Sequence, residues 1–165
     1  MGRDDGVPLT TRPVAGLIPS PDTITMTVPH PPPVADAAVV LLVEDEIDLR
    51  EIIRLLLVMR GYRVLTAGDG IEALKLFREY GRTLSVVVTD LRLPRLNGLP
   101  MLRAIRKVDP NIPFVVVSGT IADWPPKQFD GLHITALIDK PFTTDQLLNA
   151  ISDAIGRPKN SAPAE

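Results

Sequence analysis

The sequence contains no cysteine, so it can form neither a disulfide framework nor a thiolate metal site. It also has little excess charge of either sign: the net charge of −2 gives no electrostatic footprint for nucleic acid or for an anionic membrane surface. The longest uninterrupted apolar run, residues 37–43, is too short to cross a bilayer. The N-terminus lacks the basic start and the continuous apolar core of a secretory signal. These absences predict a soluble cytoplasmic protein that contacts neither nucleic acid nor membrane directly.

What the sequence has in abundance at its start is proline. Residues 1–33 hold eight of the 17 prolines, and proline removes backbone donors and blocks helix formation. We therefore predict an extended or disordered arm over residues 1–36, within which Met26 is an alternative translation start. Residues 157–165 predict a disordered tail. The intervening residues 37–156 are long enough for one domain with its own hydrophobic core.

Within residues 37–156 the pattern alternates between strand and helix. Apolar, largely β-branched stretches predict strands over residues 39–43, 63–67, 84–90, 113–117 and 134–138. Helical spacing of apolar residues follows the first, second, third and fifth stretches: Leu49, Ile52, Ile53 and Leu56; Ile71, Leu74, Leu76 and Phe77; Leu102, Ile105 and Val108; Leu147, Leu148, Ile151 and Ile155. Trp124-Pro125-Pro126 and Gly131 predict a short or irregular helix before the fifth strand. The alternation predicts an α/β fold with a doubly wound parallel sheet covered on both faces.

Polar residues stand where four of the five predicted strands end. Glu44-Asp45 follows the first strand, Asp90 the third, Ser118 the fourth and Lys140-Pro141 the fifth. Parallel strands present their carboxyl ends to one edge of the sheet, which is where open α/β sheets bind their ligands. Carboxylates crowded at this edge need a cation among them, and hard oxygen ligands without histidine or cysteine suit Mg²⁺. A carboxylate nucleophile, a hydroxyl, an ammonium group and Mg²⁺ together are the equipment for accepting a phosphoryl group.

This set of residues, in this order and spacing, resembles the receiver domain of two-component response regulators from Val39 to Ile155. The resemblance implies a flavodoxin-like sheet of strand order 2-1-3-4-5, and phosphorylation of Asp90 by a histidine kinase or a histidine phosphotransfer protein. The resemblance further implies a Mg²⁺ site, with Asp45, Asp90 and the backbone carbonyl of Arg92 as direct ligands and Glu44 as a ligand through water. It implies that Lys140 pairs with the phosphoryl group and that the bond between Lys140 and Pro141 is cis. Ser118 is implied to be the switch hydroxyl, and Gly119 to keep the approach to Asp90 open.

The sequence also departs from the family pattern. Leu137 occupies the place where the family often has an aromatic switch residue, and Pro125-Pro126 interrupts the equivalent of the family's fourth helix. Arg92 and Thr120 occupy places that in the family tune hydrolysis of the acyl phosphate. Because only about ten residues follow the last helix, we expect a stand-alone receiver whose output is protein–protein contact, in an oligomeric state that is left open.

Several alternatives stay open at this stage. Taken singly, Glu44-Asp45-Glu46 is also typical of a helix cap, Ser118-Gly119 of an ordinary turn and Lys140 of a surface lysine. Leu137 and Pro125-Pro126 also fit a phosphorylation-independent adaptor with this fold, although the presence of every acceptor-site residue argues against it. An aspartyl-phosphate hydrolase is a third interpretation, although such enzymes carry a second acid two residues after the nucleophile, where this chain has Arg92. Apolar residues Ile47 and Val58, off the core stripe of the first helix, mark a candidate docking face for the phosphodonor.

Overall fold

A computed structural model describes residues 37–156. The predicted arm, the predicted tail and Met26 therefore lie outside the described residues. Five strands alternate with helices in the following order: β1 (Val39–Val43), α1 (Ile47–Met59), β2 (Arg63–Ala67), α2 (Gly70–Tyr80), β3 (Leu84–Thr89), α3 (Gly98–Val108), β4 (Phe114–Ser118), β5 (Ile134–Asp139) and α4 (Thr144–Gly156). Single turns of 3₁₀ helix lie at η1 (Gly81–Thr83), η2 (Ile121–Asp123) and η3 (Pro126–Phe129).

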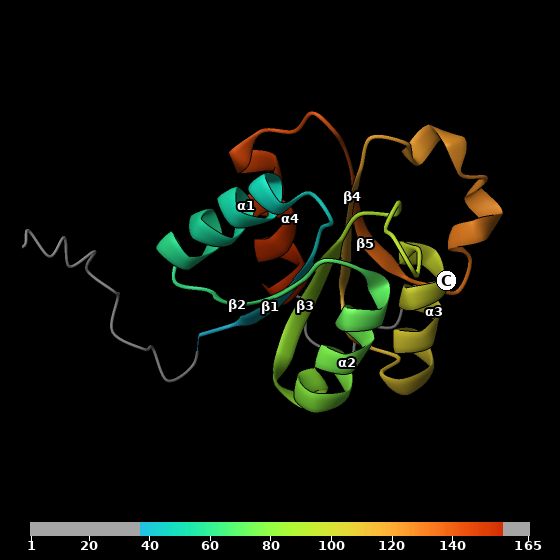
Figure 1. Ribbon diagram of the computed structural model, residues 1–165, viewed down its shortest axis with the longest axis horizontal. Helices are drawn as coiled ribbons and strands as arrows, with labels where there is room; N and C mark the ends of the chain where they lie inside the picture. Colours follow the sequence, from blue (N-terminus) through green and yellow to red (C-terminus); the bar gives the residue numbers. More distant parts are fainter. Residues whose placement is uncertain (1–36, 157–165) are drawn as a thin grey trace, which may run out of the picture. The chain divides into compact units, whose positions relative to one another are not determined.

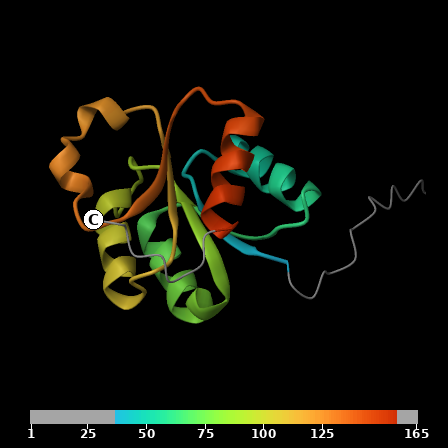
Figure 2. The ribbon, with the colours of Figure 1, turned by 180° about the vertical axis from the view of Figure 1, so that it is seen from behind.

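The five strands form one parallel sheet in the order β2-β1-β3-β4-β5, which confirms the predicted topology. Helices α1 and α4 cover one face, and α2 and α3 cover the other, as Figures 1 and 2 show from opposite sides. Alternate residues of a strand serve the two faces. In β1, for example, Leu41 packs with the core beneath α2 and α3, while Leu42 packs with the core beneath α1 and α4.

The ends of the helices agree with the sequence signals. Gly61 has a φ of 87°, and its N–H donates to the carbonyl of Val58, so it closes α1 in the left-handed conformation that glycine adopts without strain. At the start of α4, the Thr143 hydroxyl accepts from the N–H of Gln146, and the Gln146 side chain accepts from the N–H of Thr143. This reciprocal pair is the predicted capping box.

Three of the apolar residues at the predicted helical spacing are exposed instead. Ile52 on α1 is 64% exposed, Ile71 on α2 is 39% exposed and Val108 on α3 is 74% exposed, so their assignment to the buried faces was wrong. On α1 the buried stripe runs through Ile53 and Leu57, and Ile52 stands one position, about 100° of helical rotation, away from it. Val108 is the last residue of α3 and lies beyond Ile105, the last side chain of that helix to be buried.

The segment between β4 and β5 has no regular helix, as predicted: only the turns η2 and η3 lie there. Three arginines nevertheless hold it in place. Arg92 bonds to Thr120 and Asp123, while Arg103 donates to the carbonyl of Gln128 at 2.5 Å and Arg106 to that of Leu132 at 2.7 Å. Side-chain bonds from α3 and from the loop before it thus replace the backbone bonds of a continuous helix. No described helix is long and apolar enough to span a membrane.

Candidate functional site

The strands deliver the polar side chains to one edge of the sheet. Glu44, Asp90 and Lys140 each follow directly on the end of a strand, and Ser118 is the last residue of β4. Backbone bonds between neighbouring strand ends fix their register: the N–H of Glu44 donates to Ala67, that of Asp90 to Val43 and that of Lys140 to Ser118. The backbone positions from which these side chains extend are therefore held by the sheet, although the residues lie far apart in the sequence.

Both carboxylate oxygens of Asp90 are held by donors. Oδ1 accepts from the Ser118 hydroxyl at 2.8 Å and from the backbone N–H of Arg92 at 3.1 Å. Oδ2 accepts from the Lys140 ammonium at 2.7 Å, and the same ammonium donates to Oε2 of Glu44 at 2.8 Å. Glu44, Asp90 and Ser118 are buried, and the side chain of Lys140 is 22% exposed. The sequence-predicted residues Glu44, Asp90, Ser118 and Lys140 are thus brought into one hydrogen-bonded group.

Burial and the ion pairs shift the pKa values of two of these groups. Burial raises the pKa of the Glu44 carboxyl above its usual value, and the hydrogen bond and charge of Lys140 offset only part of this effect. Burial by itself would lower the pKa of Lys140, but the hydrogen bonds and negative charges of Asp90 and Glu44 outweigh it and raise that pKa. Both pKa values are raised because the ion pairs are shared unequally. Lys140 gains from two carboxylate partners, whereas Glu44 shares a single ammonium group with Asp90. The site therefore keeps its lysine charged.

The backbone beneath Asp90 leaves no space for a side chain. A Cβ added at Gly98, the first residue of α3, would lie 2.4 Å from the carbonyl oxygen of Asp90 and 2.9 Å from the Cα of Leu91. The N–H of Gly98 also donates to the carbonyl of Leu91 at 2.9 Å. The loop that carries Asp90 is thus packed directly on the start of α3. At Gly119, by contrast, a Cβ would make only an ordinary 3.8 Å contact with Lys140, and the role expected of Gly119 stays a prediction.

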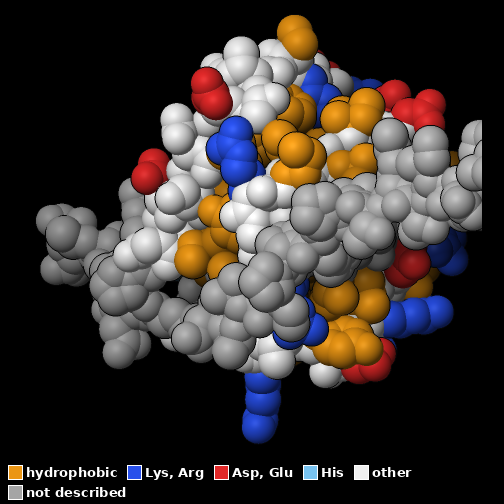
Figure 3. All heavy atoms as spheres, turned by 90° about the vertical axis from the view of Figure 1, so that its left-hand side faces the viewer, with side chains coloured by type: hydrophobic (Ala, Val, Ile, Leu, Met, Phe, Trp, Pro, Cys, Tyr) orange, Lys and Arg blue, Asp and Glu red, His pale blue; other side chains and the backbone are white. Residues whose placement is uncertain are grey.

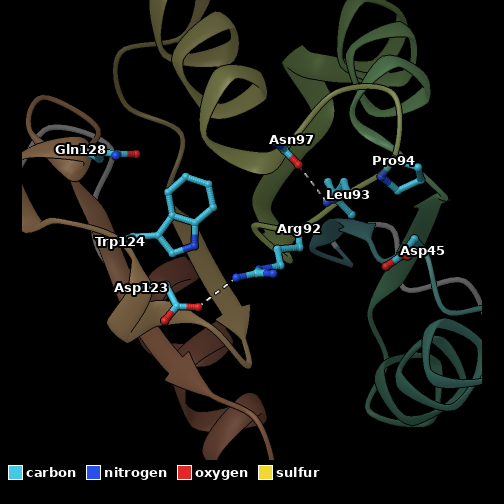
Figure 4. Close-up of a pocket in the computed structure, with 8 residues that line it drawn as sticks. All are labelled: Asp45, Arg92, Leu93, Pro94, Asn97, Asp123, Trp124 and Gln128. Carbon is cyan, nitrogen blue, oxygen red and sulfur yellow. Dashed lines mark hydrogen bonds and ion pairs between the residues drawn. The ribbon is translucent and has the colours of Figure 1, made fainter.

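The remaining predicted residues lie around the group. The Lys140-Pro141 peptide bond is cis. Leu137, on the edge strand β5, is 47% exposed. Asp45 and Arg92 line an open cavity of about 580 Å³, whose other walls are Leu93, Pro94, Asn97, Asp123, Trp124 and Gln128. Figure 4 shows Arg92 extending across this cavity toward Asp123, with Asp45 on the opposite side from Trp124.

The donor set fits Mg²⁺ in its chemistry. Glu44, Asp45, Asp90 and the carbonyl of Arg92 offer only hard oxygen ligands, which this ion prefers. Among the described residues, however, no three acidic or histidine side chains are gathered closely enough to form a metal-binding group. Lys140 instead lies between Glu44 and Asp90. If Asp45 and the other acidic side chains held this ion, they would have to move from the positions that the structure shows.

The polar contacts of two residues beside the site were not predicted from the sequence. Asp123 forms an ion pair with Arg92 at 2.9 Å, and Trp124 donates from its indole to the Thr120 hydroxyl at 3.4 Å. Trp124 also packs against the core beneath α2 and α3. No local signal marks the ion pair of Asp123, because its partner Arg92 lies 31 positions earlier in the sequence.

Comparison with known proteins agrees with the resemblance noted in the sequence. A family model described as the response regulator receiver domain matches residues 40–152. The chain is 35% identical to the sensor kinase CckA of Brucella abortus over 119 residues, which cover 72% of this chain and 13% of the kinase. The chain spans about half or less of the length of several curated relatives that it matches.

Solved structures show the same fold. A response regulator receiver domain protein from Clostridium thermocellum superposes with a TM-score of 0.65 at 32% identity, covering 72% of this chain and 94% of that one. The response regulator TrrA of Thermotoga maritima, solved in complex with Mg²⁺ and BeF, superposes with a TM-score of 0.63 at 25% identity, covering 71% and 98%.

Proposed function

The chain belongs to the response regulator receiver domain family, and from this premise we propose that Asp90 accepts a phosphoryl group from the phosphohistidine of a histidine kinase or of a histidine phosphotransfer protein. The observation that supports the proposal most strongly is that both carboxylate oxygens of Asp90 accept hydrogen bonds. One oxygen accepts from the Ser118 hydroxyl and the backbone N–H of Arg92, and the other accepts from the Lys140 ammonium. A buried strand-end carboxylate that merely capped a helix would have no need of an ammonium group and a hydroxyl from two other strands.

The proposed reaction is a transfer between two protein side chains. A carboxylate oxygen of Asp90 attacks phosphorus, the phosphorus–nitrogen bond of the phosphohistidine breaks, and the leaving imidazole nitrogen keeps the bonding pair and takes up a proton. In this proposal the Lys140 ammonium, which is bonded to Asp90, neutralises negative charge on the incoming phosphoryl oxygens, and the Ser118 hydroxyl turns from Asp90 to donate to one of them. The Lys140 ammonium and the Ser118 hydroxyl already contact the Asp90 carboxylate before the donor arrives, so neither has to be brought to it from elsewhere.

We include Mg²⁺ in the proposal, with Asp45, Asp90 and the carbonyl of Arg92 as direct ligands and Glu44 as a ligand through water. When bound, the ion neutralises charge on the phosphoryl oxygens. The output proposed is a change in protein–protein contacts in the cytoplasm, without direct binding to nucleic acid or membrane. Phosphorylation adds negative charge at Asp90, and such a charge shifts the balance between two conformations of the domain.

Phosphotransfer with an acceptor control tests the proposal. The chain is incubated with Mg²⁺ and labelled acetyl phosphate, and separately with autophosphorylated histidine kinases. We expect stoichiometric label that peptide mapping places on Asp90 and that Asp90→Asn abolishes. Glu51→Gln, which removes an exposed carboxylate on α1, serves as the matched control and keeps the label. Label retained on Asp90→Asn would contradict the assignment. Release of many equivalents of phosphate without accumulation of label would instead support the hydrolase interpretation.

A further inference from the structure

A chain of hydrogen bonds leads from Asp90 to the segment between β4 and β5. The Ser118 hydroxyl donates to Asp90 at 2.8 Å, and the Ser118 and Thr120 hydroxyl oxygens are 3.2 Å apart. The Thr120 oxygen also receives two N–H groups, from the Arg92 side chain at 3.1 Å and from the Trp124 indole at 3.4 Å. We call these five residues the Thr120 relay.

The hydrogen bonds that connect the residues of the Thr120 relay are all donated in one direction, toward Asp90. A hydroxyl carries one proton and can accept two hydrogen bonds. The Ser118 proton is used on Asp90, so the bond between the two hydroxyls must use the Thr120 proton. Both lone pairs of the Thr120 oxygen are then filled by Arg92 and Trp124. The donors of the bonds that link Arg92 and Trp124 to Thr120, Thr120 to Ser118 and Ser118 to Asp90 thus all lead toward the Asp90 carboxylate, and aligned hydrogen bonds of this kind polarise one another.

The far end of the relay reaches the part of the domain that lacks a regular helix. Trp124 is half-buried and packs against the core beneath α2 and α3, together with its neighbours Ile121 and Phe129. Arg92 continues past Thr120 to its ion pair with Asp123 in η2. On β5, by contrast, the side chain of Leu137 has no group that can hydrogen-bond, and this residue is 47% exposed. The polar route from Asp90 therefore runs through Thr120 and not through the side chain on β5.

We propose that the Thr120 relay couples the state of Asp90 to the position of Trp124 and of the η2–η3 segment, so that this segment reports phosphorylation. The proposal rests on the phosphoacceptor function of Asp90. When Ser118 turns its hydroxyl to a phosphoryl oxygen, Thr120 follows, because its proton is donated to Ser118. Arg92 and Trp124 follow Thr120 in turn. Trp124, Arg92 and Asp123 line the cavity beside the site, so the change alters the surface offered to a partner.

The chain contains a single tryptophan, so its intrinsic fluorescence reports the environment of Trp124 alone. We expect Mg²⁺ with beryllofluoride, or labelling with acetyl phosphate, to shift the Trp124 emission. In Thr120→Val, which removes the hydroxyl and keeps the shape, the shift per mole of label is lost. In Thr120→Ser, which restores the hydroxyl, the shift returns. Thr120→Ala replaces Thr120→Val if the latter fails to fold.

A second arm tests the coupling without phosphorylation. Asp90→Ala removes the acceptor at the end of the relay, and we expect it to shift the Trp124 emission when Thr120 is present but not when Thr120→Val accompanies it. An equal shift in both backgrounds, or none in either, would overturn the relay, as would an unchanged response of Thr120→Val to labelling. Absence of label on the unaltered chain would instead count against the phosphoacceptor function, so the two failures are distinguishable.

Discussion

At the scale of single residues, Lys140 decides the charge balance of the site. Its ammonium is shared between Glu44 and Asp90, which are both buried. Burial raises the pKa of Glu44, and the hydrogen bond and charge of the Lys140 ammonium offset part of this effect. In the function that we propose, the same ammonium also neutralises negative charge on the phosphoryl group.

A second ionised residue supports the loop that carries Asp90. Asp69 caps α2 by accepting from the backbone N–H groups of Ile71 at 2.8 Å and Glu72 at 2.9 Å, and its other oxygen pairs with Arg95 in the β3–α3 loop. Burial by itself would raise the pKa of Asp69, but the hydrogen bonds from Arg95 and from the two backbone amides lower it below its usual value. Asp69 thus ties the start of α2 to the loop after Asp90.

This lowered pKa gives a signed prediction for acid stability. Because the folded pKa lies below the unfolded value of about 4, the stabilisation is complete above that value and is lost as pH falls through the folded pKa. Asp69→Ala should lower the free energy of unfolding at pH 7 by about 1 kcal/mol or more, the usual worth of such a cap. Urea unfolding at pH 7 and at about pH 3 measures it, with Asp69→Asn as the variant that keeps a cap and loses the charge. A penalty for Asp69→Ala that does not shrink in acid would refute this account.

At the scale of elements, the junction between the β3–α3 loop and α3 depends on Gly98. Gly98→Ala should lower the free energy of unfolding by about 3 kcal/mol or more, because the new Cβ would lie 2.4 Å from the backbone carbonyl oxygen of Asp90. Gly156→Ala is the matched control: its Cβ would have nothing within 4 Å, so we expect a change within about 0.5 kcal/mol. Thermal unfolding of both variants provides the comparison. Equal stability of Gly98→Ala and the unaltered chain would show that the loop is free to shift.

Helix α1 offers an apolar stripe beside the site, although not quite where the sequence placed it. Ile47 is 69% exposed, as expected, but Val58 is half-buried. The exposed stripe consists of Ile52, Leu55 and Met59, which are spaced three and four residues apart and so share one side of the helix. Figure 3, which views the side of Figure 1 where α1 lies, shows hydrophobic side chains gathered on this face. The stripe is the surface on which we expect the phosphodonor to dock.

Charge placed on this stripe should separate docking from chemistry. We expect Ile52→Glu and Met59→Glu each to slow transfer from a phosphohistidine donor about tenfold, the effect of losing roughly 1.4 kcal/mol of contact energy. Labelling by acetyl phosphate, which needs no docking surface, should keep its rate. Val108→Glu alters an equally exposed apolar residue on the other face of the sheet and serves as the control. Transfer rates that fall equally with both donors would indicate damage to the fold rather than to docking.

At the scale of the whole molecule, ligand binding at Asp90 should be visible as stability. A ligand that binds only the folded state stabilises it by about 2.7 kcal/mol at a hundred times its Kd. For a domain of this size, Mg²⁺ with beryllofluoride should raise Tm by roughly 5 °C or more. Differential scanning calorimetry checks this, with Mg²⁺ alone and Asp90→Ala as controls. An equal rise in Asp90→Ala would place the ligand elsewhere.

The sequence by itself determined the strands, their order along the chain and the identity of the residues at their ends. These follow from local signals, since β-branched runs define strands and parallel strands end at one edge. The buried faces of the helices were predicted less accurately, because the spacing of apolar residues does not separate adjacent positions. Ile52, next to the buried Ile53, was assigned to the buried face of α1 but is exposed.

Only the tertiary structure decided how the loops meet. The contact of Arg92 with Thr120 and Asp123, the close approach of Gly98 to Asp90 and the pairing of Asp69 with Arg95 join segments that carry no local mark of one another. The physical reason is that strand and helix periodicity are properties of neighbouring residues. The direction in which a loop side chain extends depends instead on the packed elements that the loop connects.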